Sequence, residues 1–380
     1  MNIGLLLITT FLSALNVLAK GPEMLPVSAT AVSAPVVSFS AKPSASATEN
    51  IVLSFSGDLI IHEDLYKKVV ADKDHDFSKL WKKTFPLLAK ANFSYVNLEG
   101  PTALGITNKL QNKGDVGFIY DNEVYSGTDL LFNYHPTLID ALQKSGFDIV
   151  STVNNHSMDR GVKGINATID ALIKRNMPFI GTRKSGTEEP LYTLTKIKNF
   201  TVAWIGCTEM INGFNDRKSQ LFLCYQQREE ILKLIARVIS EKKPDVVIII
   251  PHWGVEYSPK PQQAQIDLAH EFLDMGATAV IGSHPHVLQP VEQYVTKDKR
   301  ETFIAYSLGN FVANQRGIER KSSAVIYLQL SKNKLGKTVI SDYYYEPTTR
   351  FRFDIFPARS DKDVVQHVEQ FLGPMRDLKE

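Results

Sequence analysis

Apolar residues recur along the chain in two patterns, which predict strands and helices in alternation. The clearest is the run 246–250, five β-branched residues without a polar interruption, which is typical of a strand buried on both faces. Shorter runs predict strands at 51–56, 93–98, 147–153, 177–181, 191–197, 201–207 and 279–281. Helical spacing predicts helices at 64–70, 78–89, 136–144, 164–175, 228–242 and 261–275. Strands that alternate with helices indicate an α/β domain.

The pattern changes after residue 286. Strands without intervening helices are predicted at 287–294, 302–307, 324–330 and 339–345. They predict a second, largely antiparallel sheet that packs on the first. We therefore expect one domain over 50–355, followed by a terminal helix or tail over 356–380. The Gly- and Asn-rich stretch 104–134 lacks periodicity and is interpreted as a long excursion near the functional site, with room for a hairpin.

The first residues are predicted to lie outside this domain. The span 3–19 is almost wholly apolar and ends in the small residue Ala19, as in a cleaved signal peptide. Its length approaches that of a membrane helix, and no Lys or Arg precedes it, so residues 1–20 are either a signal peptide or a retained anchor. Residues 21–49 are rich in Ser, Ala and Pro, which is typical of a tether. Both alternatives predict an extracytoplasmic location for the domain.

The net charge and the cysteine content limit which binding partners and metal sites the sequence predicts. The net charge of +2 over 380 residues is too small to indicate a nucleic-acid partner on electrostatic grounds. The two cysteines, Cys207 and Cys224, could form one disulfide outside the cytoplasm, or Cys207 could remain a buried thiol after its strand. Because no C-x-x-C motif is present, we do not expect a thiolate zinc site.

Polar side chains follow the predicted strands at the point where each strand ends. The residues are Asp58, Glu99, Asn155, His156, His252, His284 and His286. The carboxyl ends of strands in an α/β sheet border a ligand crevice. Carboxylate, amide and imidazole donors suit divalent Mn, Fe or Zn, and the set is large enough for two ions.

A single histidine after a strand is more often a hydrogen-bonded loop residue than a ligand. His284 and His286 differ, because residues two apart in an extended segment point the same way. Pro285 is expected to hold His284 in an extended conformation. The sequence therefore predicts a metal site that includes this pair.

Several motifs, in order along the chain, resemble those of the calcineurin-like metallophosphoesterases, and more closely their branch of CapA-type capsule synthesis proteins. The motifs are Gly57-Asp58, Asn97-Leu98-Glu99, Asn154-Asn155-His156 with Asp159 and Gly161, His252-Trp253-Gly254-Val255-Glu256-Tyr257, Gly276-Ala277 with Val280-Ile281-Gly282, His284-Pro285-His286 and Tyr306-Ser307-Leu308-Gly309-Asn310-Phe311. The resemblance spans about 51–311. It implies a four-layer α/β/β/α sandwich of metallophosphoesterase type.

The resemblance also implies a role for each site residue. Asp58 and His286 would bind the first metal, Glu99 would bridge, and Asn155, His252 and His284 would bind the second metal. His156 would protonate the leaving group or stabilise the transition state, a role that suits a group whose pKa lies near working pH.

Two departures from the superfamily pattern weaken the first metal site. Ile60 stands where a ligand histidine is usual, with His62 two residues further on, and Glu99 replaces an aspartate. The resemblance implies a component of capsule or poly-γ-glutamate synthesis or export, which would bind the surface polymer and could join a membrane complex. An active dinuclear hydrolase, either phosphoesterase or polymer amidase, is the alternative. Glu256 and Asn310 are candidates for substrate binding, with a solvated loop carboxylate and a tight turn as their ordinary explanations.

Overall fold

The fold is taken from a computed structural model of the chain, which describes residues 50–376 except residue 129. The predicted signal peptide or anchor and the predicted tether lie outside the described residues. Within the described part, no helix is long and apolar enough to cross a membrane.

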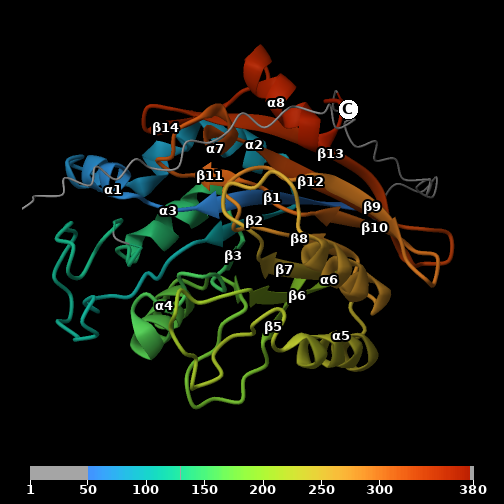
Figure 1. Ribbon diagram of the computed structural model, residues 1–380, viewed down its shortest axis with the longest axis horizontal. Coiled ribbons are helices and arrows are strands. Elements are labelled where there is room, and N and C mark those ends of the chain that lie inside the picture. The colour runs from blue at the N-terminus through green and yellow to red at the C-terminus, as the bar shows by residue number, and fades with distance from the viewer. Residues whose placement is uncertain (1–49, 129, 377–380) are drawn as a thin grey trace, which may run out of the picture. The chain divides into compact units, whose positions relative to one another are not determined.

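Two sheets form the centre of the molecule (Figure 1). The first has the order β14-β13-β12-β1-β2-β3-β4, with β11 paired to β1. Its strands are β1 (Asn50–Leu59), β2 (Phe93–Leu98), β3 (Ile149–Ser151), β4 (Phe179–Ile180), β11 (Asn310–Val312), β12 (Ser322–Lys332), β13 (Thr338–Phe351) and β14 (Asp354–Pro357). The second has the order β5-β6-β7-β8-β10-β9. Its strands are β5 (Tyr192–Ile197), β6 (Phe200–Thr208), β7 (Val246–His252), β8 (Ala279–Ile281), β9 (Val291–Val295) and β10 (Glu301–Ala305).

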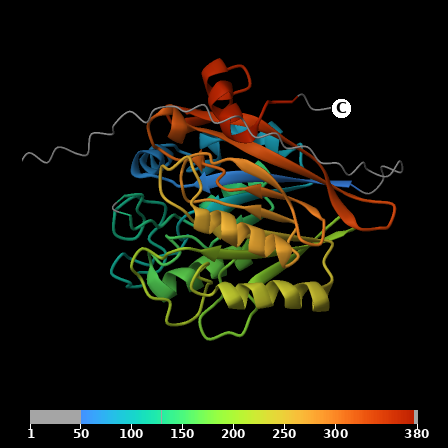
Figure 2. The same ribbon diagram turned by 45° about the vertical axis from the view of Figure 1, so that its right-hand side comes forward.

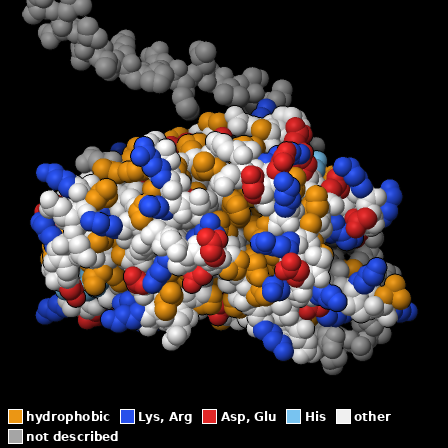
Figure 3. All heavy atoms as spheres, turned by 90° about the horizontal axis from the view of Figure 1, so that it is seen from below, with side chains coloured by type: hydrophobic (Ala, Val, Ile, Leu, Met, Phe, Trp, Pro, Cys, Tyr) orange, Lys and Arg blue, Asp and Glu red, His pale blue; other side chains and the backbone are white. Residues whose placement is uncertain are grey.

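Along the chain, helices alternate with many of the strands. In space, they pack on the outer faces of the two sheets. They are α1 (Glu63–Val70), α2 (Phe85–Leu88), α3 (Thr137–Ser145), α4 (Gly161–Lys174), α5 (Arg228–Lys242), α6 (Gln263–Asp274), α7 (Ile318–Lys321) and α8 (Lys362–Leu372). Figures 1 and 2 both show α5 and α6 near each other beside the second sheet, with α8 at the top of the molecule. On the face seen in Figure 3, Lys and Arg are interspersed with Asp and Glu, so that face carries no surface of a single charge sign.

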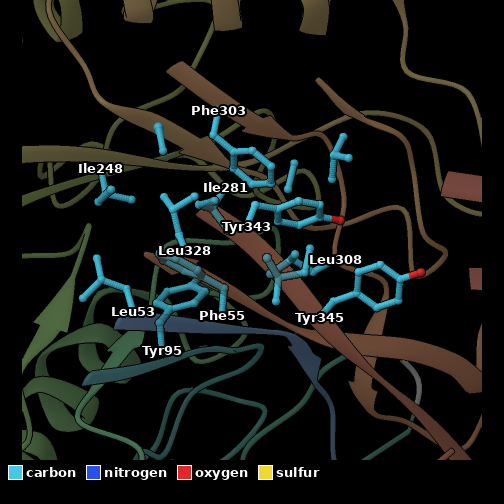
Figure 4. Close-up of a cluster of buried hydrophobic side chains, with 14 of the residues drawn as sticks. Leu53, Phe55, Tyr95, Ile248, Ile281, Phe303, Leu308, Leu328, Tyr343 and Tyr345 are labelled. Carbon is cyan, nitrogen blue, oxygen red and sulfur yellow. The ribbon is translucent and has the colours of Figure 1, made fainter. Parts of the chain in front are cut away.

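The unbroken apolar run in β7 is explained by its two faces. Ile248 and Ile250 pack in the core between the sheets, together with Phe55 and Tyr95 of the first sheet (Figure 4). Val247 and Ile249 point the other way, into a second core formed with α5 and α6. Because successive side chains of a strand alternate between faces, a strand in the middle of a layered sandwich must be apolar throughout. With a third core under α1 and α3, the layers are helix, sheet, sheet and helix, and the predicted α/β sandwich is confirmed.

The assignment of the late strands to one separate sheet was wrong. β12 pairs antiparallel with β1 from Asn50↔Ser331 to Phe55↔Ile326, and so extends the first sheet. β10 pairs parallel with β8 and extends the second. Hydrophobic periodicity indicates that a strand is buried. It does not indicate which neighbouring strand forms the backbone hydrogen bonds with it.

The predicted helix 78–89 is also wrong as a single element. It consists of two 3-10 turns, Phe77–Leu80 and Lys82–Thr84, followed by the short α2. The chain leaves helical geometry at Trp81, whose φ is −130°. Pro86 is the second residue of α2, because proline fits the first turn of a helix and not its interior.

In the excursion 104–134, the described residues, all but 129, form no strand longer than an isolated bridge, such as Ser126↔Asn133. It is held by Arg160, which is fully buried next to α4 and donates to the carbonyl oxygens of Ile106, Val124 and Leu131. The excursion lies beside α4 in both ribbon views (Figures 1 and 2). The Arg160 guanidinium and the Asn133 amide, which also donates to the Ile106 and Val124 oxygens, thus supply hydrogen bonds that regular structure supplies elsewhere.

Candidate metal centre

Two groups of buried side chains lie at the carboxyl ends of the central strands, and they share one residue. Glu99, His252 and His284 form one group, and Asp58, Glu99 and His286 form the other. Within each group the possible ligand atoms lie within 4.8 Å of one another. Glu99 belongs to both, so its carboxylate lies between two places that could each hold a cation.

Both sheets contribute to these groups. Asp58 is the penultimate residue of β1 and Glu99 follows β2, both in the first sheet. His252 ends β7, and the loop after β8 carries His284 and His286, both from the second sheet. The parallel strands of the two sheets thus end at one place, where five donors meet.

The backbone at β1 is shaped for this meeting. The Asp58 N–H donates to the carbonyl oxygen of Gly309 at 2.9 Å. A Cβ atom on Gly57 would lie 1.9 Å from that same oxygen, so only glycine permits the approach.

One Glu99 oxygen has no hydrogen-bond partner although it is buried. Oε1 lies 3.7 Å from Nε2 of His252 and 3.7 Å from Nε2 of His286. Burial, and then the nearby charge of Asp58, raise the pKa of Glu99 well above its ordinary value. A carboxylate left unpaired in a low-dielectric site is costly, and a divalent cation would offset that cost.

Burial favours the neutral form of two imidazoles near Glu99, those of His252 and His284. Burial, followed by the proximity of His284 and His286, lowers the pKa of His252 well below its usual range. Burial likewise lowers the pKa of His284 to about 4. Neutral imidazole is the form that binds metals. The orphaned carboxylate oxygen and these imidazoles together fit a divalent metal ion.

The expected geometry of the histidine pair is wrong, although both residues reach the centre. His284 and His286 have φ angles of 103° and 59°, which are left-handed and not extended. The loop therefore turns between them, and their rings lie 6.0 Å apart. The turn sends His284 to one donor group and His286 to the other, which an extended segment with both side chains on one face would not do.

Asn155 and His156 come from the loop between β3 and α4. The Asn155 side-chain oxygen lies 2.9 Å from Nε2 of His252, beside the group formed by Glu99, His252 and His284. Nδ1 of His156 lies 2.8 Å from the carboxylate of Asp159, whose same oxygen accepts the Phe132 backbone N–H. Burial raises the pKa of Asp159 although its contact with His156 opposes that shift. The pair fixes the His156 ring and leaves Nε2 available.

Three further residues contact the centre without having been assigned a role. Asn97 donates to Asp58 Oδ1 at 2.8 Å, and Ser283 Oγ lies 2.9 Å from Nδ1 of His252. Asn212 lies in the loop after β6, with Nδ2 3.3 Å from Nδ1 of His156. Asn97 belongs to the motif Asn97-Leu98-Glu99 and Ser283 lies between two motifs, so both could have been found from the sequence. Asn212 belongs to no motif, and only the fold brings it near.

The remaining candidates lie around this centre. Glu256 is exposed, and its charge contributes to the raised pKa of Glu99. Asn310 is buried, and its amide donates to the His286 carbonyl oxygen, so in this structure it ties loops together. Ile60 is buried in the core, and His62 is in neither donor group. Burial and the nearby His286 lower the pKa of His62 to about 4.

Comparison with known proteins agrees with this arrangement. Residues 52–315 match the family model described as bacterial capsule synthesis protein PGA_cap. The chain belongs to this family. The predicted membership among the CapA-type capsule synthesis proteins is thereby confirmed, and the matched span contains every donor described above.

Two relatives come from Bacillus species. The chain is 28% identical over 286 residues to the PGA biosynthesis protein CapA of Bacillus subtilis, covering 75% of this chain and 69% of that protein. It is 27% identical over 288 residues to the capsule biosynthesis protein CapA of Bacillus anthracis, covering 75% of this chain and 65% of that one. Among solved structures, the NAD nucleotidase of Haemophilus influenzae is 12% identical with a TM-score of 0.47, covering 86% of this chain and 65% of the nucleotidase.

Proposed function

We propose that this protein acts outside the cytoplasm in the synthesis or export of an acidic capsule polymer such as poly-γ-glutamate, through a centre that holds two divalent ions of Mn, Fe or Zn. The observation that carries the proposal is Glu99, whose unpaired buried oxygen lies between two donor groups. Membership in the capsule synthesis family supports a capsule polymer as the molecule on which this protein acts. The bond between Cys207 and Cys224 supports an oxidising compartment, since structural disulfides persist there.

Each donor group would hold one ion. Asp58 and His286 would bind the first, His252, His284 and the Asn155 oxygen the second, and Glu99 would bridge them. Such ions supply electrostatic stabilisation of the negative charge that develops on a phosphoryl or carbonyl oxygen. The same charge would bind the carboxylates of a polymer without any reaction. The first site has one imidazole fewer than the superfamily pattern, because Ile60 replaces it.

An active hydrolase is the second candidate, and the His156–Asp159 pair favours it. An imidazole held at Nδ1 by a carboxylate has its Nε2 fixed in one direction, as proton transfer to a leaving group requires. A protein that only binds a polymer has no need of this arrangement. The same centre thus serves either candidate, and catalysis is decided by whether His156 moves a proton.

Metal content of the full chain tests the centre. After incubation with excess Mn²⁺ and desalting, the wild-type protein should retain two equivalents by elemental analysis, and Glu99→Gln should lose both ions. His284→Ala should lose one. His270→Ala is the matched control, because His270 is paired with Glu292 on the surface and should change nothing. A wild-type protein that retains no metal while folded would refute the proposed centre.

Hydrolysis assays separate the two candidates. The metal-loaded protein would be incubated with poly-γ-glutamate and with a chromogenic phosphodiester. If the protein is a hydrolase, His156→Gln should lower the rate about 100-fold or more at unchanged metal content. No turnover of either substrate by a protein that binds two ions and poly-γ-glutamate would leave polymer binding as its function.

A further inference from the structure

The segment 313–321, which we call the α7 loop, borders the metal centre on the side of His286. Asn310 fastens it there. Its amide nitrogen lies 3.1 Å from the His286 carbonyl oxygen, 3.0 Å from the side-chain oxygen of Gln315 and 2.9 Å from the Arg320 carbonyl oxygen. The loop is fastened a second time where the Asn314 N–H donates to Nδ1 of His62 at 3.1 Å. The position of the loop is therefore coupled to that of His286.

This attachment places one arginine beside the centre. The guanidinium carbon of Arg320 lies 5.0 Å from the ring centroid of Tyr257. That ring lies 6.1 Å from the ring of His286, and Tyr257 remains 46% exposed. A cation over an aromatic face is stabilised without using its N–H donors. Arg320 thus keeps its donors for a ligand, one aromatic ring away from a metal-binding residue.

Two more arginines belong to the α7 loop or contact it: Arg316 lies in the loop and Arg350 contacts it from β13. Arg350 Nη2 donates to the Gln315 carbonyl oxygen at 2.7 Å, which brings it to the same loop. Burial, and then the charge of Arg316, lower the pKa of Arg350, and its Nε is buried without a partner. Among the described residues, none of the three arginines forms an ion pair, whereas Arg228 and Arg359 on other elements do.

The carboxylates of this region do not neutralise them. Glu319 lies in the α7 loop itself, and Glu256 adjoins Tyr257. Neither makes an ion pair with the three arginines among the described residues. The α7 loop and its contact residue Arg350 thus carry three guanidinium groups without a paired carboxylate, and an anionic ligand at the loop would gain charge-assisted hydrogen bonds from them.

We propose that Arg320, which lies over the Tyr257 ring in a loop that also carries Arg316 and contacts Arg350, binds a carboxylate of an acidic polymer while the polymer lies across the metal centre. The inference rests on the proposed function and specifies how the chain is held. A polyglutamate carries a carboxylate on every residue, so a segment at the centre presents another carboxylate beside it. The planar fork of an arginine matches a carboxylate with two parallel hydrogen bonds.

Binding of a fluorescent poly-γ-glutamate oligomer to the full metal-loaded chain tests this role. Arg320→Gln should weaken binding about tenfold, which corresponds to the loss of one charge-assisted contact. Its affinity should also fall less steeply with added salt than that of the wild-type protein. Arg237→Gln is the matched control, because Arg237 is exposed on α5 and makes no ion pair among the described residues. Metal content should be unchanged in both variants.

The outcomes distinguish the two proposals. If the wild-type protein binds the oligomer and Arg320→Gln binds it equally well, the role of Arg320 is refuted and the proposed function stands. If the metal-loaded wild-type protein does not bind the oligomer at all, the proposed function itself fails. Inorganic polyphosphate provides the third arm. A loss of polyphosphate binding in Arg320→Gln, with poly-γ-glutamate binding intact, would assign the arginine to phosphate and overturn the proposal.

Discussion

The disulfide between Cys207 and Cys224 should contribute about 3 kcal/mol to the free energy of unfolding. The bond joins the end of β6 to a residue 17 positions later, and both cysteines are fully buried. Closing a loop of that length removes chain entropy from the unfolded state equivalent to about 3 kcal/mol at room temperature. With an m-value of about 3 kcal/mol per M in urea, the unfolding midpoint should move by about 1 M.

The assay is urea unfolding of the wild-type protein with and without a reductant, beside a variant that carries Cys207→Ala and Cys224→Ala. The reductant should lower the wild-type midpoint and should leave that of the double variant unchanged. The double variant should lie at or below the reduced wild-type protein, because it also loses buried sulfur atoms. A wild-type midpoint that does not respond to complete reduction, verified by thiol titration, would refute the loop-entropy argument.

The same loop makes a second readout available. It carries Asn212, whose amide lies 3.3 Å from His156. Reduction should therefore loosen a contact of the functional site as well as the fold. Reduction should speed amide hydrogen exchange in peptides from 209–223, and should change the exchange of peptides from α5 less. Equal exchange before and after reduction would show that other contacts already hold the loop.

Three more predictions concern stability. Gly57→Ala should cost about 1–3 kcal/mol and lower metal content, because the new Cβ would meet the Gly309 oxygen at 1.9 Å; unchanged unfolding would contradict the close approach. Arg160→Met should cost about 1–3 kcal/mol and expose 104–134 to proteolysis, because the carbonyl oxygens of Ile106, Val124 and Leu131 each lose one of two donors; an intact protease pattern would contradict this. Burial lowers the pKa of His367, so the unfolded state takes up the proton first and stability falls as the pH drops below about 6.5. In His367→Leu, less stability should be lost between pH 7 and pH 5 in urea titrations, and an identical loss would show that His367 does not titrate differently on folding.

The sequence by itself determined the class of the fold and the identity of the donors. The unbroken apolar run of β7 requires burial on both faces, which a layered α/β sandwich provides. Polar residues directly after buried strands are predictable as site residues, because the carboxyl ends of parallel strands meet. Asp58, Glu99 and His252 were found in this way, and the structure brings all three together.

Only the tertiary structure decided which strands pair and how the donors divide. β10 and β12 have similar apolar patterns, yet they join different sheets, because pairing depends on backbone partners distant in sequence. The left-handed turns at His284 and His286 could not be predicted, since Pro285 favours an extended residue before it and the surrounding packing overrides that preference. Asn212 and the α7 loop reach the centre through contacts across the fold. No local pattern in the chain encodes a contact of that kind.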